Sequence, residues 1–167
     1  MPTHASCHAF AGQQRDMSRA FWAVSCTTGS PHTLLRYLVS VDFEQEYAIR
    51  FHNKIAYDDE YNGLALDDDE GHRIASKLGN KKVIFLANHG VVVVGPNVAE
   101  AFDDLYYLER AAMLQVLAQS TGRPYQKISS KVVDLTVEQM IGEAETAILH
   151  FAALKRILDK EEPDYVN

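Results

Sequence analysis

The spacing of apolar positions predicts a chain in which strands are followed by helices. Residues 83–87 and 91–94 are short apolar runs rich in β-branched side chains, which are typical of buried strands. Only three residues separate the two runs, so we expect neighbouring strands joined by a tight turn. Residues 45–51 are interpreted as a further strand, and residues 55–66 as an extended or turning segment.

Capping residues predict where three helices begin and end. Asp67 or Asp68 starts a helix that Gly79 ends, with an apolar face made of Ile74, Ala75 and Leu78. Asn97 caps the next helix, with Glu100 in the reciprocal position, and this helix runs up to Gly122. Its apolar positions recur at helical spacing and are Phe102, Leu105, Met113, Val116 and Leu117.

The last helix is expected to start near Thr136, with Gln139 in the reciprocal capping position, and to end by Pro163. The residues that it is expected to turn toward the core are Met140, Ala144, Ile148, Phe151 and Leu154. Strands followed by helices in a chain of 167 residues predict a single layered α/β or α+β unit.

The amino-acid composition argues against some classes of binding partner and indicates a cellular location. The formal net charge is −7 and the 16 basic residues are scattered, which argues against binding to nucleic acid. No apolar run approaches the length of a membrane span, and the N-terminus lacks the pattern of a signal peptide. The two cysteines, Cys7 and Cys26, form neither a zinc-knuckle motif nor a disulfide framework, so a cytoplasmic location is expected.

The strongest candidate for a functional residue is His89, which lies between the two apolar runs and is followed by Gly90. A rigid turn of this kind holds an imidazole in the fixed geometry that a metal ion needs, while glycine leaves room for backbone or substrate. The alternative is a histidine that is merely packed in a hairpin turn, and spacing alone favours this alternative.

Several blocks in register resemble the N-terminal head domain of the class II aldolase/adducin family. They are residues 55–61, 70–75 and 86–95, the last of which contains Asn88-His89-Gly90, and the similarity continues to Pro124. On this basis residues 1–167 are interpreted as one domain of that type. Residues 1–42 are divergent, residues 43–160 resemble the family, and residues 161–167 form a tail that is expected to be frayed.

The resemblance implies a fold, an activity and a site. The fold would be a three-layer αβα sandwich with a mixed or antiparallel central sheet, incomplete on its N-terminal side. The activity would be metal-dependent carbon–carbon cleavage of a small hydroxy-carbonyl compound, phosphorylated or not. His89 would be one of three imidazoles on a divalent metal, usually zinc, with Asn88, Gly90 and Tyr57 binding substrate or forming the turn. A homo-oligomer, usually a cyclic tetramer, is also implied.

The chain departs from this family pattern in one respect that affects chemistry. No His-x-His pair, the family's source of the other two imidazoles, occurs in the sequence, and the acid that the family carries further upstream is not found. Reading residues 30–38 in a shifted frame can give His-Ala-Thr-Ala-Leu, which is family-like. We therefore hypothesise that residues 15–41 are translated out of frame and expect impaired activity.

Two alternatives to an enzyme remain open. One is a non-catalytic scaffold resembling the adducin head, which acts at the actin cytoskeleton, although no Lys-rich adducin tail is present. The other is a poorly folding product with an open sheet edge.

Several other candidate residues have plainer interpretations. Tyr57 and Tyr61 are typical of packing residues, and Glu109 with Arg110 is typical of an ion-pairing or subunit-contact element. Solvent-exposed positions are expected for three isolated histidines, which are His52, His72 and His150. His4 and His8 have the spacing of one face of a helix.

Overall fold

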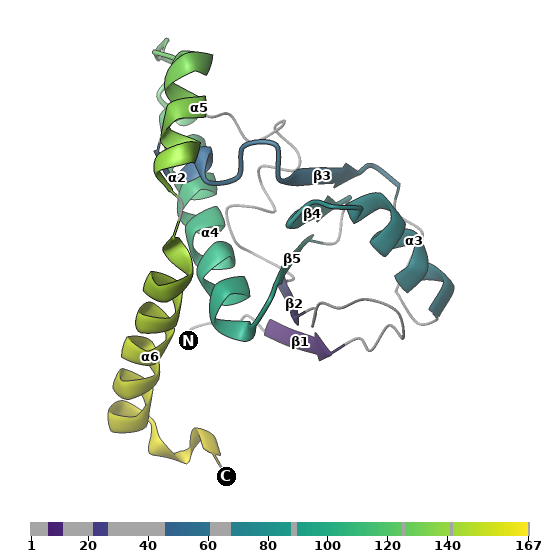
Figure 1. The fold of residues 1–167 in the computed structure, drawn as a ribbon, viewed down its shortest axis with the longest axis vertical. Helices are drawn as coiled ribbons and strands as arrows, with labels where there is room; N and C mark the ends of the chain where they lie inside the picture. The colour runs from purple at the N-terminus through teal and green to yellow at the C-terminus, as the bar shows by residue number, and fades with distance from the viewer. Residues whose placement is uncertain are drawn as a thin grey trace.

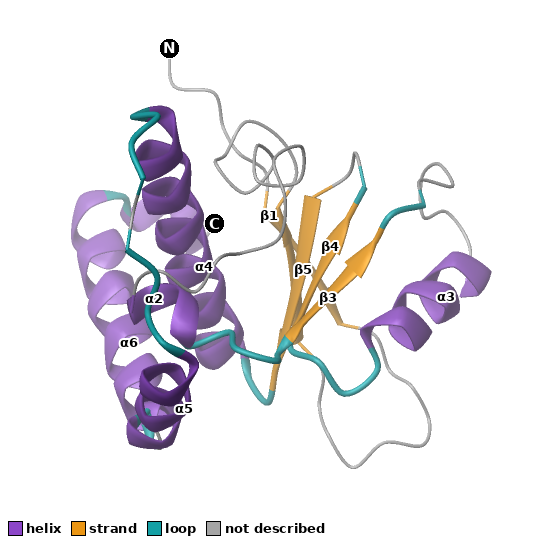
Figure 2. Cartoon of the chain, turned by 90° about the horizontal axis from the view of Figure 1, so that it is seen from above, coloured by secondary structure: helices purple, strands orange, loops and turns teal. Residues whose placement is uncertain are grey.

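A mixed β-sheet lies between helical layers in this computed structural model (Figure 1). The structure describes residues 7–11, 22–26, 46–60, 68–87, 90–124, 126–140 and 142–166. Figure 2 shows the sheet edge-on, with one helix against one face and a group of helices against the other. This arrangement confirms the predicted three-layer αβα sandwich.

Five strands of the described chain form the sheet in the order β1-β2-β5-β4-β3. Their bounds are β1 (Cys7–Ala11), β2 (Trp22–Cys26), β3 (Ile55–Asp58), β4 (Val83–Leu86) and β5 (Gly90–Gly95). Strands β3 and β4 are parallel and the other neighbours are antiparallel, so the sheet is mixed as predicted. Because β2 pairs with β5, β5 does not form an open edge of the sheet.

The helices divide between the two faces. Helix α3 (Asp68–Leu78) covers one face, while α4 (Val98–Ser120) and the short α2 (Glu46–Ile49) cover the other. Helices α5 (Ser130–Gln139) and α6 (Glu143–Glu161) lie outside α2 and α4, and a 3-10 turn, η1 (Pro163–Val166), ends the described chain. None of the helices in the described ranges is long and apolar enough to cross a membrane.

Alternating side chains of β4 and β5 supply the core on both faces of the sheet. Val83, Phe85, Val91 and Val93 pack with α4 residues such as Leu108. The intervening residues pack with α3 and are Ile84, Leu86, Val92 and Val94. Burial on both faces explains why these strands are continuous apolar runs rather than alternating patterns.

The local signals for α3, α4, β4 and β5 are confirmed. Asn97 caps α4 through its side-chain oxygen, which accepts from the Glu100 amide at 2.9 Å, and its amide group donates to the Glu100 carboxylate at 2.7 Å. Gly79 follows α3 with a φ of 56°, the left-handed conformation expected of a C-terminal stop.

The prediction of a strand at residues 45–51 is wrong, because residues 46–49 form helix α2 and residues 50–53 form a turn. Ala48, Ile49 and Phe51 are buried, and Arg50 reaches Asp103 and Asp104 on α4. Contacts with a helix more than fifty residues away therefore override the strand preference of the local sequence. His8, which has helical spacing with His4, lies on β1, and His4 is outside the described residues.

The single helix expected from Thr136 onward is also wrong. Thr136 lies inside α5, and Gly142, with a φ of 105°, separates α5 from α6. The register of α6 turns Ala144 and Ile148 to the exterior, with Ile148 50% exposed, instead of into the core. The helix ends at Glu161, before Pro163 as predicted, but residues 163–166 form η1 rather than a frayed tail.

We predict that Gly95→Ala destabilises the fold, because an added Cβ would lie 2.9 Å from the backbone nitrogen of Ala101 at the start of α4. The expected loss in the free energy of unfolding is about 1–3 kcal/mol, measured by urea denaturation. Gly71→Ala is the matched control, since nothing lies within 4 Å of its added Cβ. At this exposed helical position, alanine should raise the free energy of unfolding by about 0.5–1 kcal/mol. Equal stability of the two variants would contradict the close packing of Gly95 against the Ala101 backbone.

Candidate functional site

The carboxyl ends of β3 and β4 lie side by side, and β4 leads from there into residues 88 and 89. In the parallel register Tyr57 pairs with Phe85 and Asp58 with Leu86. The Ala87 amide donates to the Asp58 carbonyl oxygen at 2.8 Å, which extends this pairing by one residue. Asn88 and His89 themselves lie outside the described residues, and Gly90 resumes as the buried first residue of β5.

Tyr57 stands at this end of β3 and stacks on Phe85. The ring centroids are 5.6 Å apart and the planes differ by 9°. The residue is nevertheless 43% exposed, so packing holds one side of the ring while solvent reaches the residue. The packing role that its sequence suggested is therefore confirmed, and its role toward a substrate stays a prediction.

Asp58 is the buried acid at the same end of the sheet, with none of its surface exposed. Its carboxylate lies 2.6 Å from the guanidinium of Arg73 and 2.7 Å from the ammonium of Lys77, both on α3. Burial alone would raise the pKa of this carboxyl, but hydrogen bonds from Arg73 and Lys77 outweigh burial and lower the pKa to about 2. Asp58 is therefore ionised at neutral pH.

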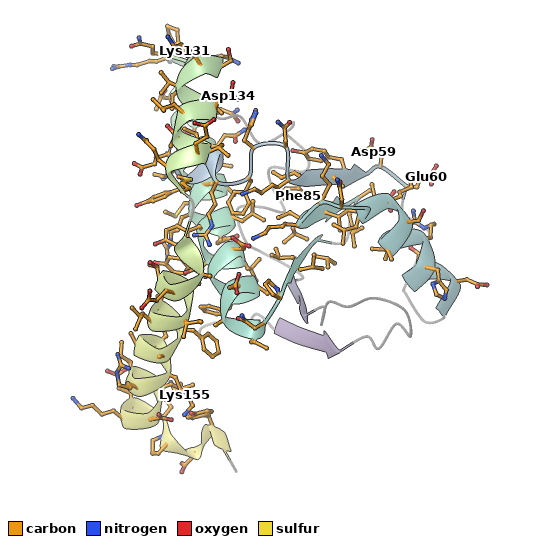
Figure 3. All side chains as sticks on the ribbon, viewed as in Figure 1. Asp59, Glu60, Phe85, Lys131, Asp134 and Lys155 are labelled. Carbon is orange, nitrogen blue, oxygen red and sulfur yellow. The ribbon has the colours of Figure 1, made fainter. Side chains whose placement is uncertain are left out.

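Two further acids complete this cluster, which we call the Asp58 cluster. Glu70 accepts two hydrogen bonds from Arg73, at 2.6 and 2.7 Å, and Glu60 accepts one from Lys77 at 3.0 Å. Figure 3 shows Asp59 and Glu60 at the end of β3 that faces α3. The cluster joins α3 to β3 near the point where β4 leads into residues 88 and 89. Of its contacts, the sequence could suggest only the Glu70–Arg73 pair, because these two residues have the three-residue spacing of neighbours on a helix.

A second group of charges lies on the opposite face of the sheet and was not predicted. Arg50 contacts Asp103 at 2.6 Å and Asp104 at 2.7 Å, and Lys82 contacts Asp104 at 3.1 Å. His150 of α6 lies 2.6 Å from the Asp103 carboxylate. This group, which we call the Arg50 cluster, joins α2, α4 and α6.

A cavity of about 150 Å³ adjoins the Arg50 cluster. Its lining residues are Arg50, Lys54, Lys82, Glu100, Asp104, Met140, Ala144 and Ala147. Lys54 and Lys82 directly precede the first residues of β3 and β4, so the cavity lies at the opposite ends of these strands from the Asn88-His89 turn. The cavity and the turn are therefore separate features.

The expectation of exposed positions for the isolated histidines holds only for His72. His150 is half-buried against Tyr106, with ring centroids 4.9 Å apart, as well as against Asp103. His52 is also half-buried and lies 3.8 Å from Asp134. Both corrections have one cause, which is that distant helices bring acids and rings to these positions.

The described residues do not bring together a three-histidine metal centre. Within the described ranges, no three His, Cys, Asp or Glu side chains come together to hold a metal ion. His89 lies outside those ranges, and the sequence offers no His-x-His pair to accompany it. A catalytic zinc normally has three protein ligands, and the sequence resemblance suggested one, His89, whose role stays a prediction.

The chain is similar in sequence to a known protein family and to several proteins of known classification. The model of the class II aldolase and adducin N-terminal domain matches residues 17–116, so the match begins within the segment 1–42 that looked divergent. A Caulobacter vibrioides protein assigned to aldolase class 2 is 37% identical over 116 residues, covering 68% of this chain and 45% of that protein. Alpha-adducin of Rattus norvegicus is 44% identical over 64 residues, covering 38% of this chain and 9% of that protein.

A solved structure of an aldolase II superfamily protein from Pseudomonas syringae shares the fold, with a TM-score of 0.75 and 28% identity. The match covers 87% of this chain and 59% of that one. The chain thus spans less than half the length of the two curated relatives and three-fifths of this structure. The assignment of residues 1–167 to a single domain stays a prediction.

We predict that Asp58→Asn removes a pH-dependent part of the stability. The folded-state pKa of Asp58 lies below the unfolded value of about 3.9, so the ionised carboxylate stabilises the fold above about pH 4. This contribution, about 2 kcal/mol, is lost as the pH falls through about 2. Urea denaturation at a series of pH values, from pH 7 down to the lowest pH at which the chain folds, measures this contribution. The difference in the free energy of unfolding between the original chain and the variant should become smaller as the pH falls.

Asp59→Asn serves as the control, because Asp59 is the exposed neighbour of Asp58. Its stability should stay within about 0.5 kcal/mol of the original chain at every pH. A difference in the free energy of unfolding between the original chain and Asp58→Asn that does not change with pH would contradict the role assigned to the carboxylate.

Proposed function

The chain belongs to the class II aldolase and adducin family, and from this premise we propose that it derives from divalent-metal-dependent carbon–carbon lyases. The substrate of that chemistry is a small hydroxy-carbonyl compound, phosphorylated or not. The observation that carries the proposal is that the buried strands β4 and β5, which residues 88 and 89 connect in the sequence, pair with each other at the carboxyl end of β3. Ends of buried strands hold side chains in fixed geometry.

Under this proposal His89 is the remaining metal ligand, with zinc or another divalent ion as the expected cofactor. Asn88 and Gly90 form the turn that presents it, and Tyr57 is a substrate-side hydroxyl supported from behind by Phe85. A single imidazole does not hold a catalytic ion, so metal binding is weak and lyase activity is impaired. No reaction step through a metal follows from this set of residues.

We further propose that the chain is cytoplasmic and self-associates, as a tetramer according to the resemblance. The support for self-association is an array of apolar side chains that the described structure leaves exposed on α4, α5 and α6. They include Leu117, Val132, Leu135, Ile148, Leu149 and Ile157. Exposed apolar groups of this extent are typical of interaction surfaces.

The second candidate is a non-catalytic binding protein of the adducin type that acts at the actin cytoskeleton. Two observations favour it over an active enzyme, namely the local identity with alpha-adducin and the incomplete histidine set. Against actin binding stands the net charge of −7, since acidic proteins and the acidic actin filament repel each other.

We predict that the purified chain binds Zn²⁺ with millimolar rather than sub-micromolar affinity in isothermal calorimetry, because one imidazole replaces three. His89→Ala should abolish even this weak binding. His72→Ala should leave it unchanged, since His72 is an exposed histidine of α3 that the proposal does not place in the site. One full zinc equivalent retained through dialysis would show that a complete site exists.

We predict no co-sedimentation of the chain with actin filaments at physiological salt, because like net charges repel. The pellet should contain no more of the chain than a tube without filaments. Saturable pelleting that persists in His89→Ala would instead favour the adducin-type function, as no metal ligand would be involved.

A further inference from the structure

The cavity of about 150 Å³ that adjoins the Arg50 cluster is not used by the proposed function. It lies where the starts of β3 and β4 meet α4 and the junction of α5 with α6. Figure 1 shows α5 and α6 following one another alongside α4. One water molecule needs only about 10–15 Å³ of comparable space, so the cavity has room for a small organic molecule.

Two lysines on neighbouring strands line this cavity. The backbone carbonyl oxygen of Lys54, directly before β3, accepts hydrogen bonds from the Lys82 amide at 3.0 Å and from the Val83 amide at 3.1 Å. These bonds hold the two lysines next to each other where the parallel pair of strands begins, and both residues are half-buried. Arg50, directly after α2, is the third cation of the lining.

The lining offers more hydrogen-bond donors than its acids can accept. Asp104 uses one carboxylate oxygen on Arg50, at 2.7 Å, and the other on Lys82, at 3.1 Å. Glu100 is the second acid of the lining, and the Asn97 amide group donates to it at 2.7 Å. Because each ammonium has three N–H donors and a guanidinium has five, these cations can hold an anion in addition to the acids. The two carboxylates favour an anion with a single charge, since they repel further negative charge.

The remaining lining residues are apolar and come from the end of α5 and the start of α6. They are Met140, Ala144 and Ala147, which lie on either side of the break at Gly142. Alanine leaves space that a larger side chain would occupy, and methionine is flexible enough to adapt to what it contacts. Cations next to apolar side chains suit a carboxylate with a short aliphatic chain better than an inorganic ion, which has no apolar part to contact them.

We propose that this cavity is a binding site for a small aliphatic monocarboxylate. Its carboxylate accepts hydrogen bonds from Lys54 and Lys82, and its alkyl chain contacts Met140 and Ala144. Such a ligand joins the starts of β3 and β4 to the junction of α5 with α6, so its binding stabilises the folded chain. The cavity lies at the opposite ends of these strands from residues 88 and 89, so the inference does not depend on metal binding.

The test is isothermal calorimetry of the full chain with sodium butyrate, with the ionic strength held constant by sodium chloride. We expect saturable binding with a dissociation constant of about 1 mM, which is the range for a ligand of so few atoms. Butylamine has the same alkyl chain with a positive charge and should not bind. Inorganic phosphate should bind roughly tenfold more weakly than butyrate, because it lacks the alkyl chain and carries more charge.

A first substitution tests the cation. Lys54→Met removes the ammonium group but keeps an unbranched side chain, so butyrate binding should weaken roughly tenfold. Lys81→Met is the matched control, because Lys81 donates to the Asn53 carbonyl oxygen and is not part of the lining. Its affinity for butyrate should equal that of the original chain.

A second substitution tests the site without removing a cation. Ala144→Glu adds an acid in the first turn of α6, where negative charge stabilises a helix, so the variant should fold even if Lys54→Met does not. The added carboxylate competes for the lysines and repels the ligand, so butyrate binding should weaken roughly tenfold or more. Thr146→Glu is the matched control, since it adds the same charge in the same turn at an exposed position outside the lining.

Three outcomes overturn the proposal. The first is the absence of saturable butyrate binding, and the second is butylamine or phosphate binding as tightly as butyrate. The third is unchanged butyrate affinity in the folded variants Lys54→Met or Ala144→Glu. Urea denaturation of each variant confirms that it is folded under the conditions of the calorimetry.

Discussion

The antiparallel pairing of β4 with β5 is the constraint on which the rest of the structure depends. Both strands are buried on both faces, so the pairing fixes the positions of α3 and α4 at once. It also fixes the turn between the strands at the edge where β3 ends. His89 follows β4 and precedes β5 in the sequence, so any function of its imidazole depends on this pairing.

The elements predictable from sequence are those specified by neighbouring residues. Asn97 and Glu100 cap each other within one turn, Gly79 ends α3, and the valine run from Val91 specifies a buried strand. The failures involve long-range contacts. Residues 46–49 form a helix whose neighbour Arg50 contacts Asp103, more than fifty residues away, and α6 after the break at Gly142 packs on α4.

The same distinction applies to the candidate site. The resemblance that singled out Asn88-His89-Gly90 was carried by contiguous residues, whereas the Asp58 cluster joins β3 to α3 across up to nineteen positions. No periodicity reveals such a cluster, because Asp58 and Lys77 become neighbours only when the sheet and helix have packed. The cluster holds the carboxyl end of β3 against α3, on the side of the sheet where β4 leads into residues 88 and 89.

The most direct test of the central claim, that His89 is one remaining ligand of an ancestral three-histidine site, is imidazole ¹⁵N NMR during a zinc titration of the folded chain. The account predicts that the His89 ring signals shift at millimolar zinc while those of His72 and His150 stay in place. A His89 ring that contacts only core side chains and does not respond to zinc would contradict the account.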